Sequence, residues 1–284
     1  MAKPVPAIAA LASLAVLVVG CQAPAELSPT PALTPTVTTS VPSNGVNPPA
    51  TESASASATQ TPSPAAKPLA GRTIVIDPGH NGVWTKRELR KVPSGNGRMK
   101  ECNSSGTASN AGYSEHAYNW AQANALAKSL RAQGATVRLT RANDHGEGPC
   151  VNLRSKLANE LKADALVSIH ADGDLARGAR GFHVIYSTTM AGGARMEAAS
   201  ERLAKQVRNA IQARTPMPRS TYIGHGTALH ARTDLGTLNL SQRPAVMIEM
   251  GNMRNATDAG LLASASFRAK VAQALTAAIV AYLG

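Results

Sequence analysis

The sequence predicts an α/β fold: a mostly parallel, twisted sheet flanked by helices on both faces, in a single domain at residues 71–284. In this part of the chain, short apolar runs rich in β-branched residues alternate with segments that carry apolar residues at helical spacing. All aromatic residues lie at or after Trp84, whereas most prolines lie before Gly71, so only the later part can bury a core. No run of 18 apolar residues exists, which excludes a multispanning membrane protein.

Residues 1–20 are typical of an export signal. Lys3 precedes an apolar stretch, 7–20, which has the length of a secretory signal and is too short to span a bilayer. It ends in Val18-Val19-Gly20-Cys21, which resembles a bacterial lipoprotein box, where the cysteine is acylated and becomes the first mature residue. The alternative is ordinary signal cleavage after Ala25, which would remove Cys21. We therefore expect an exported protein of the cell envelope, either anchored to the membrane through lipid on Cys21 or periplasmic or secreted.

Residues 21–70 are expected to form a disordered linker that begins at Cys21. They are mostly Pro, Ser, Thr and Ala, a composition typical of a solvated, partly polyproline-like chain. Fully extended, the segment would reach on the order of 160 Å at ~3.3 Å per residue. That length would let an anchored protein reach an external polymer, and it is equally consistent with a passive spacer.

The three cysteines also favour export. If Cys21 carries lipid, Cys102 and Cys150 remain, both in loop-like sequence, and they could form a disulfide in an oxidising compartment. A metal site is less favoured, because neither cysteine has a Cys or His partner two to four residues away.

Five strands are expected in the predicted domain. The first, at 72–77, is a β-branched run that stops at the turn signal Pro78-Gly79. The others are similar runs at 135–140, 165–170, 182–186 and 245–250.

Four helices are expected between and after these strands. Ser114 can cap the first, which runs to about Gln133 and ends at Gly134. Each helix has an apolar stripe: Trp120, Ala123, Ala127 and Leu130 in the first, Leu153, Leu157 and Leu161 in the second, Met196, Leu203, Val207 and Ile211 in the third, and Val271, Leu275, Ile279 and Tyr282 in the last.

Polar residues at the strand ends carry the candidate chemistry. Asp77 and His80 follow the first strand, His170 ends the third, Glu249 lies near the end of the last, and Glu115 starts the first helix. In a parallel sheet the carboxyl ends of the strands meet at one edge, where functional groups gather. Two imidazoles and one carboxylate are a common catalytic zinc set, and a second glutamate beside the metal-bound water can act as its base.

Each of these residues alone has a simpler explanation. A histidine after an apolar strand is more often structural than a ligand, and a carboxylate at a helix start interacts favourably with the helix dipole. Glu249 is harder to explain in this way. It follows Ala-Val-Met-Ile and precedes Met, so it would be buried, and buried carboxylates are usually paired, bound to metal or functional.

Four motifs in order carry a family resemblance. They are residues 75–82 (VIDPGHNG), 114–119 (SEHAYN), 166–172 (LVSIHAD) and 244–252 (PAVMIEMGN). Together they resemble the zinc-dependent N-acetylmuramoyl-L-alanine amidases of the AmiC-like (amidase type 3) family. Residues 71–284 are most similar to the mycobacterial-type single-domain amidases, although the long, basic segment 83–112 departs from the family pattern.

The resemblance implies a catalytic domain that holds one zinc ion with His80, Glu115 and His170. It implies Glu249 as the catalytic base. It also implies hydrolysis of the amide bond between N-acetylmuramic acid and L-alanine in peptidoglycan or muropeptides, as part of cell-wall remodelling or recycling. Two alternatives stay open: a wall-binding module that has lost catalysis, and a zinc peptidase that cuts the stem peptide.

Further residues are candidates for supporting roles. Asp77 could orient a ligating imidazole, or it could hydrogen-bond the backbone of the turn at 78–79. Arg243, Asn252 and His225 are candidate substrate contacts. His183, His230 and His145 have no spacing that links them to the metal set, and we interpret them as surface or structural residues.

The net charge of +12 suits an acidic polymer such as cell-wall glycopeptide. Nucleic acid would fit the charge as well, but the export signal and the scarcity of aromatic residues for base stacking argue against it. We expect a monomer that meets the membrane through its lipid anchor only.

Overall fold

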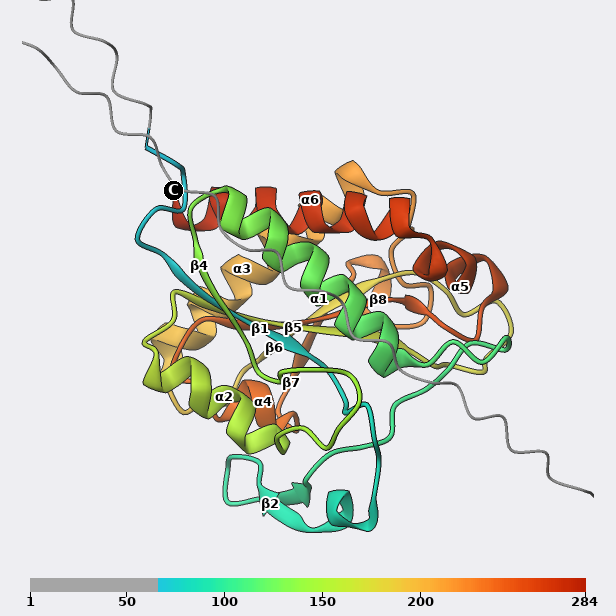
Figure 1. Cartoon of the computed structure of the whole chain (residues 1–284), viewed down its shortest axis with the longest axis horizontal. Coiled ribbons are helices and arrows are strands. Elements are labelled where there is room, and N and C mark those ends of the chain that lie inside the picture. Colours follow the sequence, from blue (N-terminus) through green and yellow to red (C-terminus); the bar gives the residue numbers. More distant parts are fainter. Residues whose placement is uncertain (1–65) are drawn as a thin grey trace, which may run out of the picture. The chain divides into compact units, whose positions relative to one another are not determined.

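The computed structural model describes residues 66–284 (Figure 1). The predicted signal, the lipidation site Cys21 and most of the predicted linker lie outside the described residues. The described part contains a six-stranded sheet made of β1 (Thr73–Pro78), β4 (Thr136–Leu139), β5 (Ala165–Asp172), β6 (His183–Ser187), β7 (Leu229–Arg232) and β8 (Ala245–Asn252). None of the helices in residues 66–284 is long and apolar enough to cross a membrane.

The strands are ordered β4-β1-β5-β8-β6-β7, and the sheet is mostly parallel, as predicted. β4, β1, β5 and β8 run in one direction. β6 pairs with β8 in the antiparallel sense, and β7 runs parallel to β6. The predicted strand at 182–186 therefore exists but points the opposite way, and β7 was not predicted.

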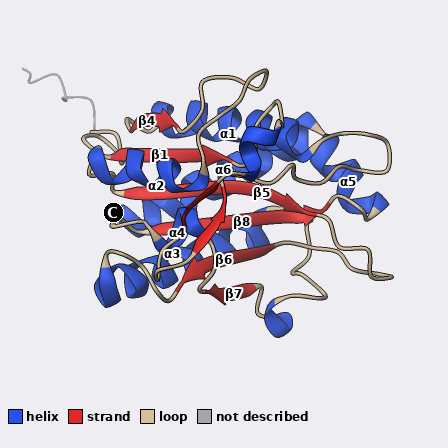
Figure 2. Cartoon of the chain, turned by 90° about the horizontal axis from the view of Figure 1, so that it is seen from below, coloured by secondary structure: helices blue, strands red, loops and turns tan. Residues whose placement is uncertain are grey.

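Helices cover both faces of the sheet, which confirms the predicted layers (Figures 1 and 2). α1 (Glu115–Ala132), α3 (Gly193–Arg214) and α6 (Ala265–Leu283) pack on one face, where strand residues such as Ile74 and Ile248 complete the larger core. α2 (Val151–Glu160) and α4 (Gly236–Asn239) pack on the other face, against residues such as Val75 and Met247. α5 (Ala256–Ala263) precedes α6. Because successive strand residues point to opposite faces, Glu249 lies on the face of Met247, with α2 and α4.

The predicted apolar stripes hold for the third and last helices, now α3 and α6, but fail for α2. Leu153 and Leu161 are 42% and 38% exposed, whereas Arg154, Ser155 and Ala158 are buried. The stripe of leucines therefore gave the wrong face. The buried face of α2 is the one that carries Arg154, whose guanidinium hydrogen-bonds to polar groups of the domain.

The first helix starts at Glu115, as predicted, but the Ser114 side chain makes no cap hydrogen bond. Trp120 is only half-buried, and the Arg141 guanidinium stacks on its ring at 5.1 Å. The rest of the predicted stripe, Ala123, Ala127 and Leu130, is fully buried, together with Tyr118 and Leu126.

The basic segment between β1 and α1 forms a small unit beside the domain. It contains the short helix η1 (Lys86–Leu89) and a two-stranded antiparallel hairpin of β2 (Lys91–Pro93) and β3 (Met99–Glu101). A disulfide joins Cys102, just after the hairpin, to Cys150, just before α2, so the predicted pair is present. The hairpin is thereby tied to the helix that carries Arg154.

Candidate metal centre and active site

A cleft of about 770 Å³ opens at the carboxyl end of the parallel strands. Asp77, His170 and Glu249 come from β1, β5 and β8 and line it together. Glu115 reaches it from the start of α1, and His80 from the loop after β1. The five predicted residues thus meet at one edge of the sheet.

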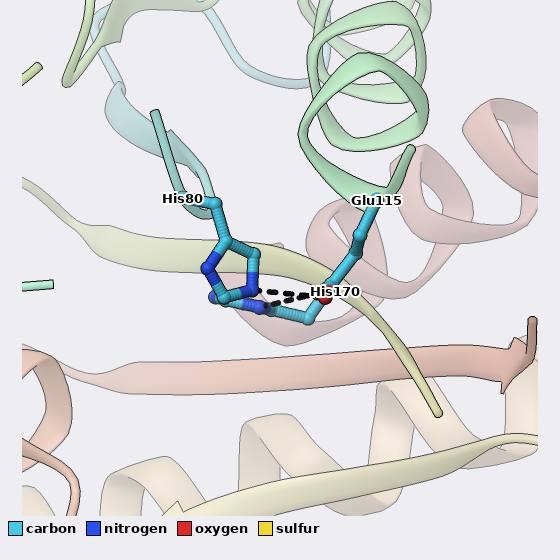
Figure 3. A group of neighbouring side chains, drawn as sticks. All are labelled: His80, Glu115 and His170. Carbon is cyan, nitrogen blue, oxygen red and sulfur yellow. Dashed lines mark hydrogen bonds and ion pairs between the residues drawn. The ribbon is translucent and has the colours of Figure 1, made fainter. Parts of the chain in front are cut away.

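His80, Glu115 and His170, which all line the cleft, form a compact group (Figure 3). His80 Nε2 lies 2.9 Å from Glu115 Oε2, and His170 Nδ1 lies 2.9 Å from Glu115 Oε1. One ligand atom from each residue falls within 4.8 Å of the others. This spacing brings two imidazole nitrogens and a carboxylate oxygen close enough to share a metal ion.

The Glu115 carboxylate is held by backbone as well as by the histidines. Oε2 accepts a hydrogen bond from the Thr107 amide at 3.0 Å, and Oε1 accepts one from the Ala171 amide at 3.2 Å. Burial alone would raise the pKa of Glu115, but His80 and His170 outweigh it and hold the pKa well below its usual range. Glu115 is therefore an anion at neutral pH, as a metal ligand must be.

A backbone carbonyl group orients the His80 ring. Its Nδ1 lies 2.8 Å from the carbonyl oxygen of Ser104, so an N–H at this position would leave Nε2 free to bind a metal. The backbone of His80 is left-handed, with φ of 59°, a conformation that non-glycine residues adopt at a cost. Arg154 Nη2 donates to the His80 carbonyl at 2.9 Å, which helps to hold this conformation.

Arg154 is a functional residue that sequence reasoning missed. Its Nη1 donates to Asp77 Oδ1 at 2.6 Å and to the Pro78 carbonyl at 2.9 Å. Asp77 also accepts from the hydroxyls of Thr140 at 2.6 Å and Ser168 at 2.7 Å. Burial would raise the pKa of Asp77, but Arg154 and these hydroxyls outweigh it and lower the pKa.

The contacts of Asp77 match neither predicted role in full. Among the described residues, its carboxylate has no hydrogen bond to a ligating imidazole or to the backbone of the turn. It pairs instead with Arg154, and it is Arg154 that binds the backbone of the loop carrying His80. Asp77 therefore positions His80 indirectly.

Two glycines leave room for the ligand rings. A Cβ on Gly79 would overlap the His170 imidazole, and a Cβ on Gly106 would lie 2.9 Å from Cδ2 of His80. We expect Gly79→Ala to weaken metal binding by about 10- to 100-fold, because the His170 ring must move from its present position. A metal-competition titration measures this effect. Gly260→Ala is the matched control, since a Cβ there meets nothing within 4 Å, and equal metal affinity in the two variants would contradict the prediction.

Glu249 lies in the same cleft without a partner. Its Oε2 is buried and makes no hydrogen bond to any described residue. Burial, together with the carboxylates of Glu115 and Asp172, raises the pKa of Glu249 well above its ordinary value. These surroundings favour the protonated form of the Glu249 carboxyl group over its anion.

The three candidate substrate contacts are not brought to the cleft. Arg243 lies before β8, at the opposite end of that strand from Glu249, and its Nε donates to the Ala163 carbonyl. Asn252 is buried, and its amide binds the carbonyls of Asp174 and Ala179 at 2.8 Å each, which fixes the loop after β5. His225 is exposed in η2 (Gly224–Gly226), away from the residues that line the cleft.

Comparison with known proteins shows similarity over most of the described residues. The family model of the N-acetylmuramoyl-L-alanine amidases matches residues 74–281. The chain is 42% identical over 215 residues to the N-acetylmuramoyl-L-alanine amidase Rv3717 of Mycobacterium tuberculosis, covering 76% of this chain and 88% of the relative. The residues matched by the family model, 74–281, include all four motifs.

Solved structures show the same fold. The N-acetylmuramyl-L-alanine amidase Ami1 of Mycobacterium smegmatis superimposes with a TM-score of 0.72 at 40% identity, covering 76% of this chain and 98% of that one. The apo form of Ami1 from Mycobacterium abscessus gives a TM-score of 0.72 at 42% identity, covering 76% and 100%. The family model covers most of the described residues, and the chain therefore belongs to the N-acetylmuramoyl-L-alanine amidase family.

Proposed function

We propose that this protein hydrolyses the amide bond between N-acetylmuramic acid and L-alanine in peptidoglycan, with a zinc ion held by His80, Glu115 and His170 and with Glu249 as the base. One observation carries the proposal: in a member of the amidase family, three ligand groups share a cleft with a carboxyl group that has no partner of its own. A wall-binding module would have no use for such a buried carboxyl group.

The residues fit zinc. Two imidazole nitrogens and one carboxylate oxygen are a frequent catalytic zinc set that leaves a position for water. The contact between His80 Nδ1 and the Ser104 carbonyl leaves the opposite nitrogen facing Glu115. When bound, zinc would lower the pKa of a water molecule and polarise the substrate carbonyl.

The protein's own part in the reaction falls to Glu249. The Glu249 carboxylate accepts the proton of the attacking water and later delivers it to the L-alanine nitrogen, which is a poor leaving group until it is protonated. The raised pKa of Glu249 means that this carboxyl group holds an accepted proton more firmly than an exposed glutamate would.

The cleft itself suits an acidic stem peptide. Lys91 and Lys100 of the hairpin line it; Lys91 pairs with Glu101 at 3.3 Å, and Lys100 Nζ donates to the Asp234 carbonyl at 2.9 Å. We propose that these two lysines, rather than Arg243 and Asn252, contact carboxylates of the substrate.

Removal of the metal tests the proposal. Chelation should abolish release of the stem peptide from muramyl dipeptide, and one equivalent of zinc should restore it. Mass spectrometry separates the alternatives: muramic acid plus intact peptide identifies the amidase, whereas a clipped peptide identifies a peptidase acting on the stem. Equal rates before and after chelation would contradict the metal centre.

We also propose that the protein is exported, anchored through lipid on Cys21, and monomeric. The Cys102–Cys150 disulfide supports an oxidising compartment, since such bonds rarely persist in the cytosol. Labelling with a fatty-acid analogue, compared between wild type and Cys21→Ser, tests the anchor.

A further inference from the structure

Four neighbouring strands place titratable side chains side by side on the cleft face of the sheet. His170 on β5 is in register with Glu249 on β8, and Glu249 is in register with His183 on β6. His230 on β7 is in register with Ile185, two residues along β6 from His183, so it lies on the same face. These four side chains therefore form a row across the sheet, from the proposed metal ligand His170, past the proposed base Glu249, to the edge strand β7.

The two outer histidines are part of this row rather than isolated structural residues. The His183 side chain is buried, and its ring centroid lies 6.0 Å from that of His230. The rings of His183 and Tyr222 are nearly perpendicular, with their centroids 6.2 Å apart. Tyr222 has its own partner, because its hydroxyl donates to Asp172 Oδ2 at 3.1 Å.

Three polar atoms in the row are buried and lack a partner among the described residues: Glu249 Oε2, His183 Nδ1 and His230 Nδ1. Leaving a buried polar atom unpaired is costly, so native structures rarely leave several together. No hydrogen bond joins any two of these atoms, and buried polar groups left in this way are commonly satisfied by a water molecule with two to four polar partners.

His183 is kept neutral by its surroundings. Burial, with the nearby His230 and Arg232, lowers the pKa of His183 to about 3. A neutral imidazole has one nitrogen that donates and one that accepts, so it can bind a water in either sense. A charged imidazole would instead stabilise the Glu249 anion and make it a weaker base.

We propose that His183 is a positioning residue for Glu249, joined to Glu249 Oε2 by a bound water that His230 also contacts. This inference rests on the proposed role of Glu249 as the base. His183 does not line the cleft, so it acts through Glu249 and not on the substrate. The water restrains the carboxyl group in one orientation, toward the ligand group, without adding charge beside it.

Two substitutions separate positioning from packing. His183→Leu removes both ring nitrogens, whereas His183→Asn keeps an amide nitrogen near the place of Nδ1. On muramyl dipeptide we expect His183→Leu to lower kcat by about 10- to 100-fold with KM and zinc content unchanged, and His183→Asn to recover most of the loss. His145→Leu, which replaces an exposed histidine, is the control and should match the wild type.

The outcomes are distinct. Two results would overturn the positioning role: a wild-type kcat in His183→Leu, or an equal loss of kcat in His183→Leu and His183→Asn. Should the Leu variant fail to fold, a high-resolution crystal structure of the wild-type holoenzyme decides: a water bound to both Glu249 Oε2 and His183 Nδ1 supports the proposal, and its absence overturns it. Failure of the wild type itself to release muramic acid would contradict the proposed function, which this series measures separately.

Discussion

The Glu249→Gln variant should bind one zinc ion per chain and turn over substrate about 10²–10⁴-fold more slowly than the wild type. Glutamine has nearly the size and shape of glutamate, so the cleft and the three ligands are left intact. It cannot accept a proton, however, and the leaving nitrogen then receives none. Metal analysis and single-turnover rates on muramyl dipeptide measure the two properties independently.

The control for this variant is Glu160→Gln, which alters an exposed glutamate at the end of α2. It should be indistinguishable from the wild type. Retained turnover in Glu249→Gln would remove Glu249 as the base, and loss of zinc from that variant would show that Glu249 belongs to the metal site instead.

Arg154→Met should destabilise the domain by about 3–5 kcal/mol, because it leaves the buried carboxylate of Asp77 without its counter-ion. The side chains of this pair are only 2% and 1% exposed. The variant also loses the hydrogen bonds to the carbonyls of Pro78 and His80, so metal affinity should fall as well. Urea unfolding of the metal-free protein gives the first effect, and zinc titration gives the second.

A second substitution tests the cause. Adding Asp77→Asn to Arg154→Met removes the unpaired charge and should recover part of the lost stability, though not the metal affinity. Lys156→Met breaks only an exposed pair with Glu160 and should cost less than about 1 kcal/mol. If Arg154→Met were as mild as Lys156→Met, the buried ion pair would not be the element that holds this loop.

The apolar runs of the sequence predicted most of the sheet and its helical layers, but not the direction of β6. A run such as 182–186 encodes burial and not orientation, because side chains alternate in the same way whichever way a strand points. β7 was missed for a different reason. It has four residues, Leu-His-Ala-Arg, and forms only because β6 offers it a free edge.

The proposed metal ligands could be predicted because each follows or starts a regular element, and because their motifs resemble a family. Arg154 could not be predicted in this way. Its partner Asp77 is 77 residues away in the sequence. On α2 the leucines give a clearer apolar stripe than the residues that the fold actually buries.

Nearness in sequence to Glu249 also misled the choice of substrate contacts. β8 has eight residues and spans roughly 26 Å at ~3.3 Å per residue. Arg243 precedes this strand, so it lies at the end of the sheet opposite the cleft. Asn252 lies at the correct end, but its amide is fully used by two backbone carbonyls.

The ligand group is assembled from the loop after β1, the first turn of α1 and the end of β5, with Glu249 added from β8. No short fragment of the chain contains all four side chains, so metal affinity belongs to the whole cooperative unit. Any ion that binds only the folded chain raises its unfolding free energy by mass action, by about 2.7 kcal/mol at a free concentration of 100 times Kd. Loss of the proposed zinc ion would therefore lower the unfolding free energy of the protein as well as stop the proposed reaction.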